Sequence, residues 1–415
     1  MKVVKKRIAR LLRWSEKYTK TDMIYIARGG FWMVLTRVFL LIISFATLAA
    51  FGNLLPSETY GTYQFIISTV GILSITALPG LGSAMIRSIA KKKEASFDLA
   101  FKTKLKWATL GSLALLLISG WYYINGNDLL AVAFLIVAPI FPLKMASGIF
   151  AGFWNGRKKF DKRMILKVST DAGIAISVII ALFATDNLWI IIATFFFSTA
   201  LFNFLAYLYT FKQVENEEID EEMIPYGKNL TVMGFIGNIA SHLDKIVIWK
   251  FLGPVEVAVY TFSYTPIKKL KGFLPINALL LPKLSESGVK GEKRKKKIFK
   301  KFLLMFAITI PFAALLAGAA PFVYKIVFPQ YLDSVIYFQV LTTLVALLPF
   351  TVLATSLVAE MQTKYLYISR TVVPTAKIVL FLVLTPIYDI WGVIFAVVFT
   401  VFMGGMINLY FFWRM

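Results

Sequence analysis

The sequence predicts an all-α integral membrane protein with about twelve transmembrane helices. Hydrophobic residues make up 58% of the 415 positions, and the mean hydropathy is +0.73. Soluble domains usually contain about 45–50% apolar residues. Stretches close to the roughly 20 apolar residues that a bilayer core requires recur along the whole chain, with only short polar connections between them. These observations exclude a water-soluble fold and leave no room for a separate soluble domain.

The predicted spans divide into two six-helix lobes. We expect a basic N-terminal segment at 1–26, one lobe at 27–211, an acidic linker at 212–227 and a second lobe at 228–415. The spans are expected at 27–51, 61–86, 107–124, 129–153, 168–184, 188–211, 228–251, 256–281, 302–320, 334–359, 367–387 and 390–412.

Lys and Arg residues alternate between rich and bare connections. Eight precede the first span, and the connections 87–106, 157–167 and 283–301 carry seven, six and nine. The connections between these are nearly bare, which is the positive-inside pattern. We therefore predict a multi-pass protein of the cytoplasmic (inner) membrane with both termini cytoplasmic. Topology, rather than nucleic acid, accounts for the net charge of +23.

The basic N-terminal segment precedes a span that is too long for a signal-peptide core, so we expect it to be retained. Its apolar residues alternate with lysines and arginines, which is typical of an interfacial helix that contacts membrane lipids. The basic run 293–297 is either a site for anionic headgroups or a solvated determinant of topology.

A short internal repeat supports the division into two lobes. Pro56 and Glu58 are followed by Tyr60, and in the second half Pro254 and Glu256 are followed by a tyrosine. The spans around both turns run in the same direction. The two lobes would therefore be related by an axis along the membrane normal.

Six cationic residues lie deep inside the predicted spans. A Lys or Arg that faces lipid at the centre of a span costs roughly 2.5–3.5 kcal/mol. Such residues must therefore face a hydrated cavity, a counter-ion or a shared anionic ligand. The six are Arg37, Lys144, Lys268, Lys269, Lys271 and Lys377.

Acidic residues within the spans are too few to neutralise these cations. Asp244 is the only acid clearly inside a span. The surplus of positive charge favours a polyanionic substrate, because a diphosphate accepts several charge-assisted hydrogen bonds. Asp244 itself is either a site for a coupling ion, Na⁺ or H⁺, or a charge that fixes the neighbouring Lys245.

Each candidate residue also has a structural interpretation. The lysines of span eight lie near Pro266 and Gly272, which favour a bend, but a misplaced boundary would put them at the cytoplasmic edge. Arg37 could pair with Asp244 or with carbonyls of a neighbouring helix. Arg28, nearer the cytoplasmic interface, is either a substrate ligand or an interfacial anchor. Lys144 and Lys377 could each be a cavity ligand or a structural partner.

The sequence contains no signature of an enzyme or of a resident cofactor. It has no cysteine and one histidine, His242, so thiolate and histidine metal sites are not expected. Walker A, Rossmann, zinc-protease and nucleophile-elbow motifs are absent from the sequence. Energy for any transport must therefore come from a gradient or from the substrate.

Several segments, in their order along the chain, resemble the polysaccharide transporters of the multidrug/oligosaccharidyl-lipid/polysaccharide (MOP) superfamily, including the O-antigen (Wzx-type) flippases. The segments that carry this resemblance are 55–63, 80–87, 152–160, 244–254, 281–285 and 328–331. The resemblance implies a V-shaped pair of lobes, as in multidrug exporters of the MATE type, around a central cationic cavity.

By the same resemblance, the substrate would be a polyprenyl-diphosphate-linked oligosaccharide, moved by alternating access, with polysaccharide assembly enzymes as further partners. Basic residues on spans one and eight would grip the diphosphate, and Arg37 and the three lysines of span eight stand at matching places. Lysines replace the arginines that are more usual there, which puts bidentate binding in doubt.

Three other functions fit the sequence less well than a flippase. A multidrug exporter of the same superfamily should carry acidic cavity residues, and Asp244 is the only one. A membrane glycosyltransferase, polymerase or ligase generally has one large external loop, whereas the longest external connection here is 321–333. A pure scaffold protein would not need cations at mid-membrane.

Overall fold

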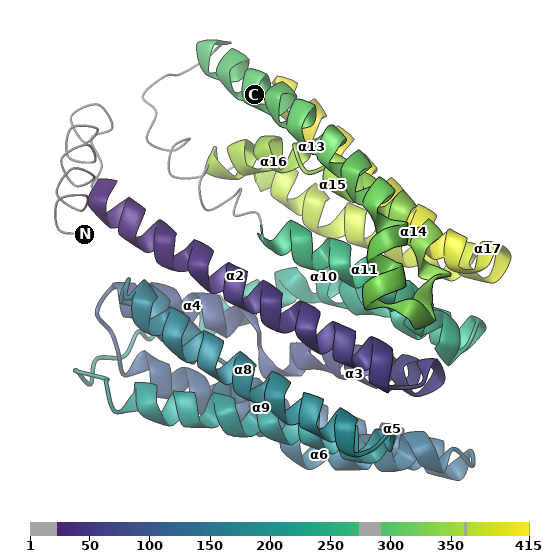
Figure 1. The fold of residues 1–415 in the computed structure, drawn as a ribbon. Helices are drawn as coiled ribbons and strands as arrows, with labels where there is room; N and C mark the ends of the chain where they lie inside the picture. Colours follow the sequence, from purple (N-terminus) through teal and green to yellow (C-terminus); the bar gives the residue numbers. More distant parts are fainter. Residues whose placement is uncertain (1–22, 274–291, 361–362, 415) are drawn as a thin grey trace, which may run out of the picture.

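The computed structural model describes residues 23–273, 292–360 and 363–414, which form helices joined by short connections (Figure 1). Seven helices in this part of the chain are long and apolar enough to cross a membrane, or up to nine if each of two bent helix pairs counts as one span. The prediction of an all-α, multi-pass membrane protein is confirmed. Residues 1–22, most of the predicted N-terminal segment, lie outside the described residues, as do residues 274–291.

The first half of the chain contains one of the two bent pairs: α3 and α4 meet at a bend of 48°. The bend falls at Leu78, whose φ of 49° is left-handed, and at Pro79, which lacks a backbone N–H for a helical hydrogen bond. The elements are α2 (Met23–Leu54), α3 (Ser57–Leu73), η1 (Ser74–Ala77), α4 (Gly80–Ala90), α5 (Ser96–Ile124), α6 (Asp128–Ser147), α7 (Phe150–Gly156), α8 (Phe160–Ala184) and α9 (Leu188–Phe211).

The second half contains the other bent pair, α14–α15 with α16, at 44°. Its last helix covers predicted spans eleven and twelve, and non-helical backbone at Tyr388 and Asp389 marks the break between them. The elements are α10 (Met223–Phe251), α11 (Pro254–Phe273), α13 (Glu292–Val327), η2 (Pro329–Tyr331), α14 (Ser334–Leu341), α15 (Thr343–Ala346), α16 (Phe350–Ala359) and α17 (Thr363–Arg414).

Helices α10 and α11 join the two halves. In Figure 1 the helices α3–α9 gather on one side and α13–α17 on the other, with α2, α10 and α11 between them. Helix α10 packs against α3, α4 and α17, and α11 packs against α2, α3 and α14. Neither α10 nor α11 is among the seven apolar candidates, because charged residues such as Asp244 and Lys268 interrupt their apolar runs.

The two turns of the internal repeat pack directly against each other. A Cβ atom on Gly61 of α3 would lie 1.7 Å from the carbonyl oxygen of Pro254, so only glycine permits this approach of α3 to α11. The Tyr60 and Phe262 rings meet at a centroid distance of 5.0 Å, and both tyrosines of the repeat, Tyr60 and Tyr260, are buried. The repeat therefore lies at the contact between the halves.

The acidic connection before α10 is bound to the connection between α4 and α5. The amide of Asn216 donates to the carbonyl of Lys92 over 2.7 Å, and the backbone N–H of Asp220 donates to Ser96 Oγ over 2.9 Å. Helix α10 then begins at Met223, within the predicted linker 212–227. This arrangement fixes the start of α10 to the first half of the chain.

Ion pairs reinforce this attachment outside the membrane-spanning segments. Arg157, at the end of α7, makes a two-point contact with Glu94 and reaches Glu215 at 3.1 Å. Burial raises the pKa of the Glu94 carboxyl, but the hydrogen bonds from Arg157 and from the Glu215 backbone outweigh this and hold the pKa below its usual value. Asp220 lies 3.6 Å from the ammonium of Lys91.

Candidate functional site

Three lysines from three helices lie around one buried carboxylate. Asp244 on α10 is 1% exposed, and the charges of Lys245 on α10, Lys268 on α11 and Lys377 on α17 act on it. Its Oδ1 accepts a hydrogen bond from the backbone N–H of Lys245 at 2.9 Å, and its Oδ2 accepts one from the Tyr260 hydroxyl at 3.0 Å. Asp244 is therefore held in place by its own helix and by α11.

The Lys245 side chain turns away from Asp244. Its ammonium donates to Gln64 Oε1 on α3 over 2.6 Å, so this bond joins the two halves of the chain. His242, one turn earlier on α10, lies against α3 as well, because a Cβ on Gly71 would come within 2.5 Å of its ring. One face of α10 is thus pressed against the first half near the carboxylate.

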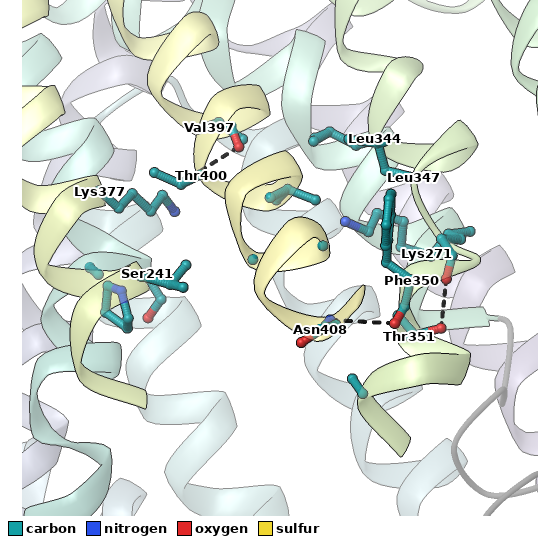
Figure 2. A pocket seen from close by; sticks show the side chains of 18 of the residues that line it. Ser241, Lys271, Leu344, Leu347, Phe350, Thr351, Lys377, Val397, Thr400 and Asn408 are labelled. Atoms are coloured by element: carbon teal, nitrogen blue, oxygen red, sulfur yellow. Dashed lines mark hydrogen bonds between the residues drawn. The ribbon is translucent and has the colours of Figure 1, made fainter. Parts of the chain in front are cut away.

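A pocket of about 340 Å³ lies beside these residues, between α10, α11, α15, α16 and α17. Lys271 and Lys377 line it, and Figure 2 shows their ammonium groups pointing inward from opposite sides of the view. The charges of Lys377 and Lys268 act on Lys271, so the three ammonium groups share one region. The pocket gathers positive charge.

The remaining walls of the pocket are largely apolar. Tyr264, Val397 and Val401 contribute apolar surface, and Thr400 and Asn408 add polar groups. The Asn408 side chain donates to the carbonyl of Phe350 over 3.4 Å, which braces α17 against α16 (Figure 2). Every lining residue belongs to the second half of the chain, whereas the family resemblance implied a cavity between the two lobes.

Lys269 points in another direction from Lys268 and Lys271. Its ammonium donates to Ser44 Oγ of α2 over 3.1 Å. The charges of Asp171 and Lys167, both on α8, also act on it. Lys269 therefore connects the lysines of the second half with the charged residues of α8 in the first half.

The five lysines carry more charge than the nearby acids neutralise. Among the described residues, none of Lys245, Lys268, Lys269, Lys271 and Lys377 has a carboxylate oxygen within 4 Å of its ammonium. Asp244 faces the group, and Asp171 is already bonded to Lys167 at 2.6 Å. We call these five lysines together with Asp244 the lysine cluster; its net charge is positive.

Other predicted residues lie elsewhere. The Lys144 ammonium sits over the Phe196 ring at 4.2 Å and the Phe195 ring at 5.2 Å, a cation–π arrangement between α6 and α9. Arg37 lies on α2, where its charge acts on Arg163 of α8. The side chain of Arg28 is outside the described part of the structure, and its role stays a prediction.

The structure places several charged residues within helices of the bundle that the sequence does not single out as candidates. From the sequence, Lys245 is only the neighbour of Asp244, and Arg163 and Lys167 belong to the predicted basic connection 157–167. The structure starts α8 at Phe160, so these two residues belong to a membrane-candidate helix. A helical reading of 160–167 would have placed Arg163, Lys167 and Asp171 on one face, because they are four residues apart.

Carboxylates are too scattered for a metal site: in the parts of the chain that the structure covers, no three His, Cys, Asp or Glu side chains come together to hold an ion. The chemistry that the lysine cluster offers is the binding of an anion through ammonium donors.

Comparison with known structures shows the fold. The chain is similar to the lipid II flippase MurJ in an inward closed conformation, with a TM-score of 0.70 and 15% identity over 92% of this chain and 87% of that one. It is also similar to an inward-facing multidrug resistance MATE family transporter of the MOP superfamily, with a TM-score of 0.65 and 12% identity over 92% and 98%. The chain is similar as well to a MOP superfamily transporter from Pyrococcus furiosus, with a TM-score of 0.63 and 13% identity over 94% of this chain and 95% of that one.

No curated protein sequence matches the chain significantly. The model of the polysaccharide biosynthesis protein family matches residues 26–288, which is more than half of the chain. The predicted family is therefore confirmed, and the chain belongs to the polysaccharide biosynthesis protein family.

Proposed function

We propose that the protein is a flippase that moves a polyprenyl-diphosphate-linked oligosaccharide from the cytoplasmic to the outer leaflet by alternating access. The observation that carries this proposal is the positively charged lysine cluster within helices of a membrane fold. A lipid diphosphate supplies the negative charge that the cluster lacks, and several ammonium groups can donate to its oxygens at once.

The family and the fold support the same substrate class. Members of the matched family serve polysaccharide biosynthesis by name, and the similar MurJ structure is by name a lipid II flippase. Twelve spans in two lobes, with Arg37 near the access route and Lys268, Lys271 and Lys377 at the diphosphate, complete the proposed arrangement. Both termini would lie in the cytoplasm.

The packing at the repeated turns supports a cycle that begins with the outer end closed. Gly61 lies against the Pro254 backbone, and the Phe262 ring stacks on Tyr331 at a centroid distance of 3.8 Å. In the proposed topology these contacts lie at the outer face. Opening them while the cytoplasmic ends approach would release the substrate to the outer leaflet.

The lysine cluster also weighs against an exporter of organic cations. Such a substrate would meet Lys271 and Lys377 in the pocket, and like charges in a partly desolvated site repel strongly. Asp244, the buried acid beside these lysines, already accepts hydrogen bonds from Tyr260 and the Lys245 backbone. We propose that Asp244 fixes these neighbours and organises the lysines; coupling to Na⁺ or H⁺ is its alternative role.

Reconstitution tests the proposed function. Full-length protein in vesicles should move a fluorescent polyprenyl-diphosphate disaccharide between leaflets, and the triple variant Lys268→Gln, Lys271→Gln and Lys377→Gln should slow this by about 100-fold or more. Lys250→Gln, an exposed residue of α10, is the matched control and should leave the rate unchanged. Equal rates in the triple variant and the control would remove the proposed site.

A further inference from the structure

Helix α8 carries a second charged region that the lysine cluster does not include. Arg163, Lys167 and Asp171 follow one another at four-residue intervals, so they share one face of the helix over a rise of about 12 Å. Helix α8 packs extensively against α2. This charged face thus runs along the seam between α2 and α8.

Arg163, near the start of α8, has unused binding capacity. Its Nε is buried and has no hydrogen-bond partner among the residues described. The charge of Arg37 on α2 acts on it, so a second cationic residue lies near Arg163. Buried polar groups are almost always bonded in native proteins, so a buried guanidinium N–H without an acceptor points to a ligand that supplies one.

Lys167 continues the charged face toward the interior. Its ammonium bonds to Asp171 Oδ1 at 2.6 Å, while about a third of its side chain remains exposed. Asp171 and Lys167 in turn act on Lys269 of α11, which bonds to Ser44 of α2. The charges therefore continue from Arg163, through Lys167, to Lys269 of the lysine cluster.

We propose that Arg163 and Lys167 form a loading site for the diphosphate of the lipid-linked substrate. The substrate binds at this loading site before it binds at the lysine cluster. This inference rests on the proposed function and adds a second anion position to it. Arg163 presents a planar guanidinium with N–H donors suited to phosphate oxygens, and Lys167 adds a point charge. Asp171 holds Lys167 until the substrate arrives.

A loading site makes a different prediction from a structural role. Loss of a group that captures substrate raises the concentration needed for half-maximal transport, whereas the maximal rate depends on the lysine cluster beyond it. Arg163→Gln and Lys167→Gln should each raise the half-saturating substrate concentration by about 10-fold and change the maximal rate by less than about twofold. Asp171→Asn should lower the half-saturating concentration, because it releases Lys167.

The experiment measures initial flipping rates against the density of fluorescent polyprenyl-diphosphate disaccharide in vesicles. Lys162→Gln is the matched control. It removes one charge from the position directly before Arg163 on α8, and the Lys162 ammonium sits over the Trp154 ring at 4.7 Å. Arg163→Lys keeps the charge but lacks the planar set of N–H donors, so its half-saturating concentration should lie between those of wild type and Arg163→Gln. Inorganic diphosphate on the cytoplasmic side should compete with the lipid-linked substrate and slow its transport by wild type. It should slow transport by Arg163→Gln less.

The outcomes separate the two proposals. If wild type transports the lipid and the two α8 variants saturate like Lys162→Gln, the loading site is refuted and the flippase stands. If wild type moves no lipid-linked sugar, the proposed function fails and the loading site fails with it. A fall in maximal rate for Arg163→Lys as well as Arg163→Gln, with unchanged half-saturation, would assign Arg163 to packing.

Discussion

The Lys245 ammonium on α10 donates to Gln64 Oε1 on α3 across 2.6 Å, one residue along the chain from Asp244, which bonds within the second half. Two neighbouring charged residues of α10 thus serve the two halves of the molecule. The Lys245 bond must lengthen if α3 and α10 separate during a transport cycle. Through this contact, one lysine of the lysine cluster takes part in holding the two halves of the chain together.

Gln64→Leu should destabilise the protein by about 1–3 kcal/mol, because it leaves the Lys245 ammonium without its acceptor. Thermal unfolding in detergent micelles measures the change. The double variant Gln64→Leu with Lys245→Met should recover part of the loss, since both partners are then apolar. Equal stability of wild type and the single variant would show that the bond contributes nothing to the packing of α3 on α10.

Gly61→Ala should disrupt the contact of α3 with α11, because its Cβ would lie 1.7 Å from the Pro254 carbonyl oxygen and backbone must move. We expect a loss of about 2 kcal/mol or more, as for an overpacked core. Gly82→Ala on α4 is the control, since nothing lies within 4 Å of its Cβ, and it should be neutral or slightly stabilising. Thermal unfolding of both variants compares them; a tolerated Gly61→Ala would contradict the close approach.

The attachment of the acidic connection should weaken in acid. The pKa of Glu94 lies below its usual value, so its contribution is complete above the unfolded-state pKa of about 4.3 and is lost as the pH falls through the folded-state pKa. Protease protection of residues 212–222, measured from pH 7 down to pH 3, should therefore fall at the acid end of this range.

Glu94→Gln should cost about 1–3 kcal/mol at pH 7, because Glu94 and Arg157 are 8% and 7% exposed and the change removes the charge that Arg157 contacts at two points, while Glu215 still pairs with the guanidinium. The stability of the Glu94→Gln variant should also depend less on pH than the stability of wild type does. Glu217→Gln, an exposed acid of the same connection, should behave like wild type. An unchanged pH profile in Glu94→Gln would contradict the assignment.

Removing one charge from the pocket should stabilise the unliganded protein while it impairs transport. Lys271 and Lys377 repel each other in a partly apolar pocket, so Lys271→Met should raise the unfolding free energy by about 1 kcal/mol. Thermal unfolding with and without polyprenyl diphosphate measures this, and the ligand should stabilise wild type more than the variant. A variant less stable than wild type without ligand would argue for a structural role of Lys271.

The sequence was most informative where physics leaves few alternatives. Apolar run length predicted the helical membrane fold, and the break between the last two spans falls at Tyr388 and Asp389, between the predicted spans 367–387 and 390–412. The repeat around Pro56 and Pro254 predicted two equivalent turns, but not that they touch. That contact depends on Gly61, whose close neighbour is almost two hundred residues away in the sequence.

Helix neighbours, by contrast, could not be read from sequence. Lys144 and Lys377 were equivalent candidates, and only the packing of α6 on α9 shows Lys144 over phenylalanine rings while Lys377 lines the pocket. Arg163 was assigned to a connection because basic residues there also determine topology. When a helix starts inside a basic stretch, the sequence alone does not distinguish a basic residue that determines topology from a basic residue of the helix that binds a ligand.

Binding of a polyprenyl diphosphate tests the central claim most directly. Native mass spectrometry of the full-length protein in micelles should show one polyprenyl-diphosphate disaccharide bound, no complex with the matching uncharged polyprenol, and at least about 10-fold weaker binding when Lys268, Lys271 and Lys377 are changed to Gln. Equal binding of the diphosphate and the uncharged polyprenol, or equal binding by wild type and the triple variant, would contradict the account.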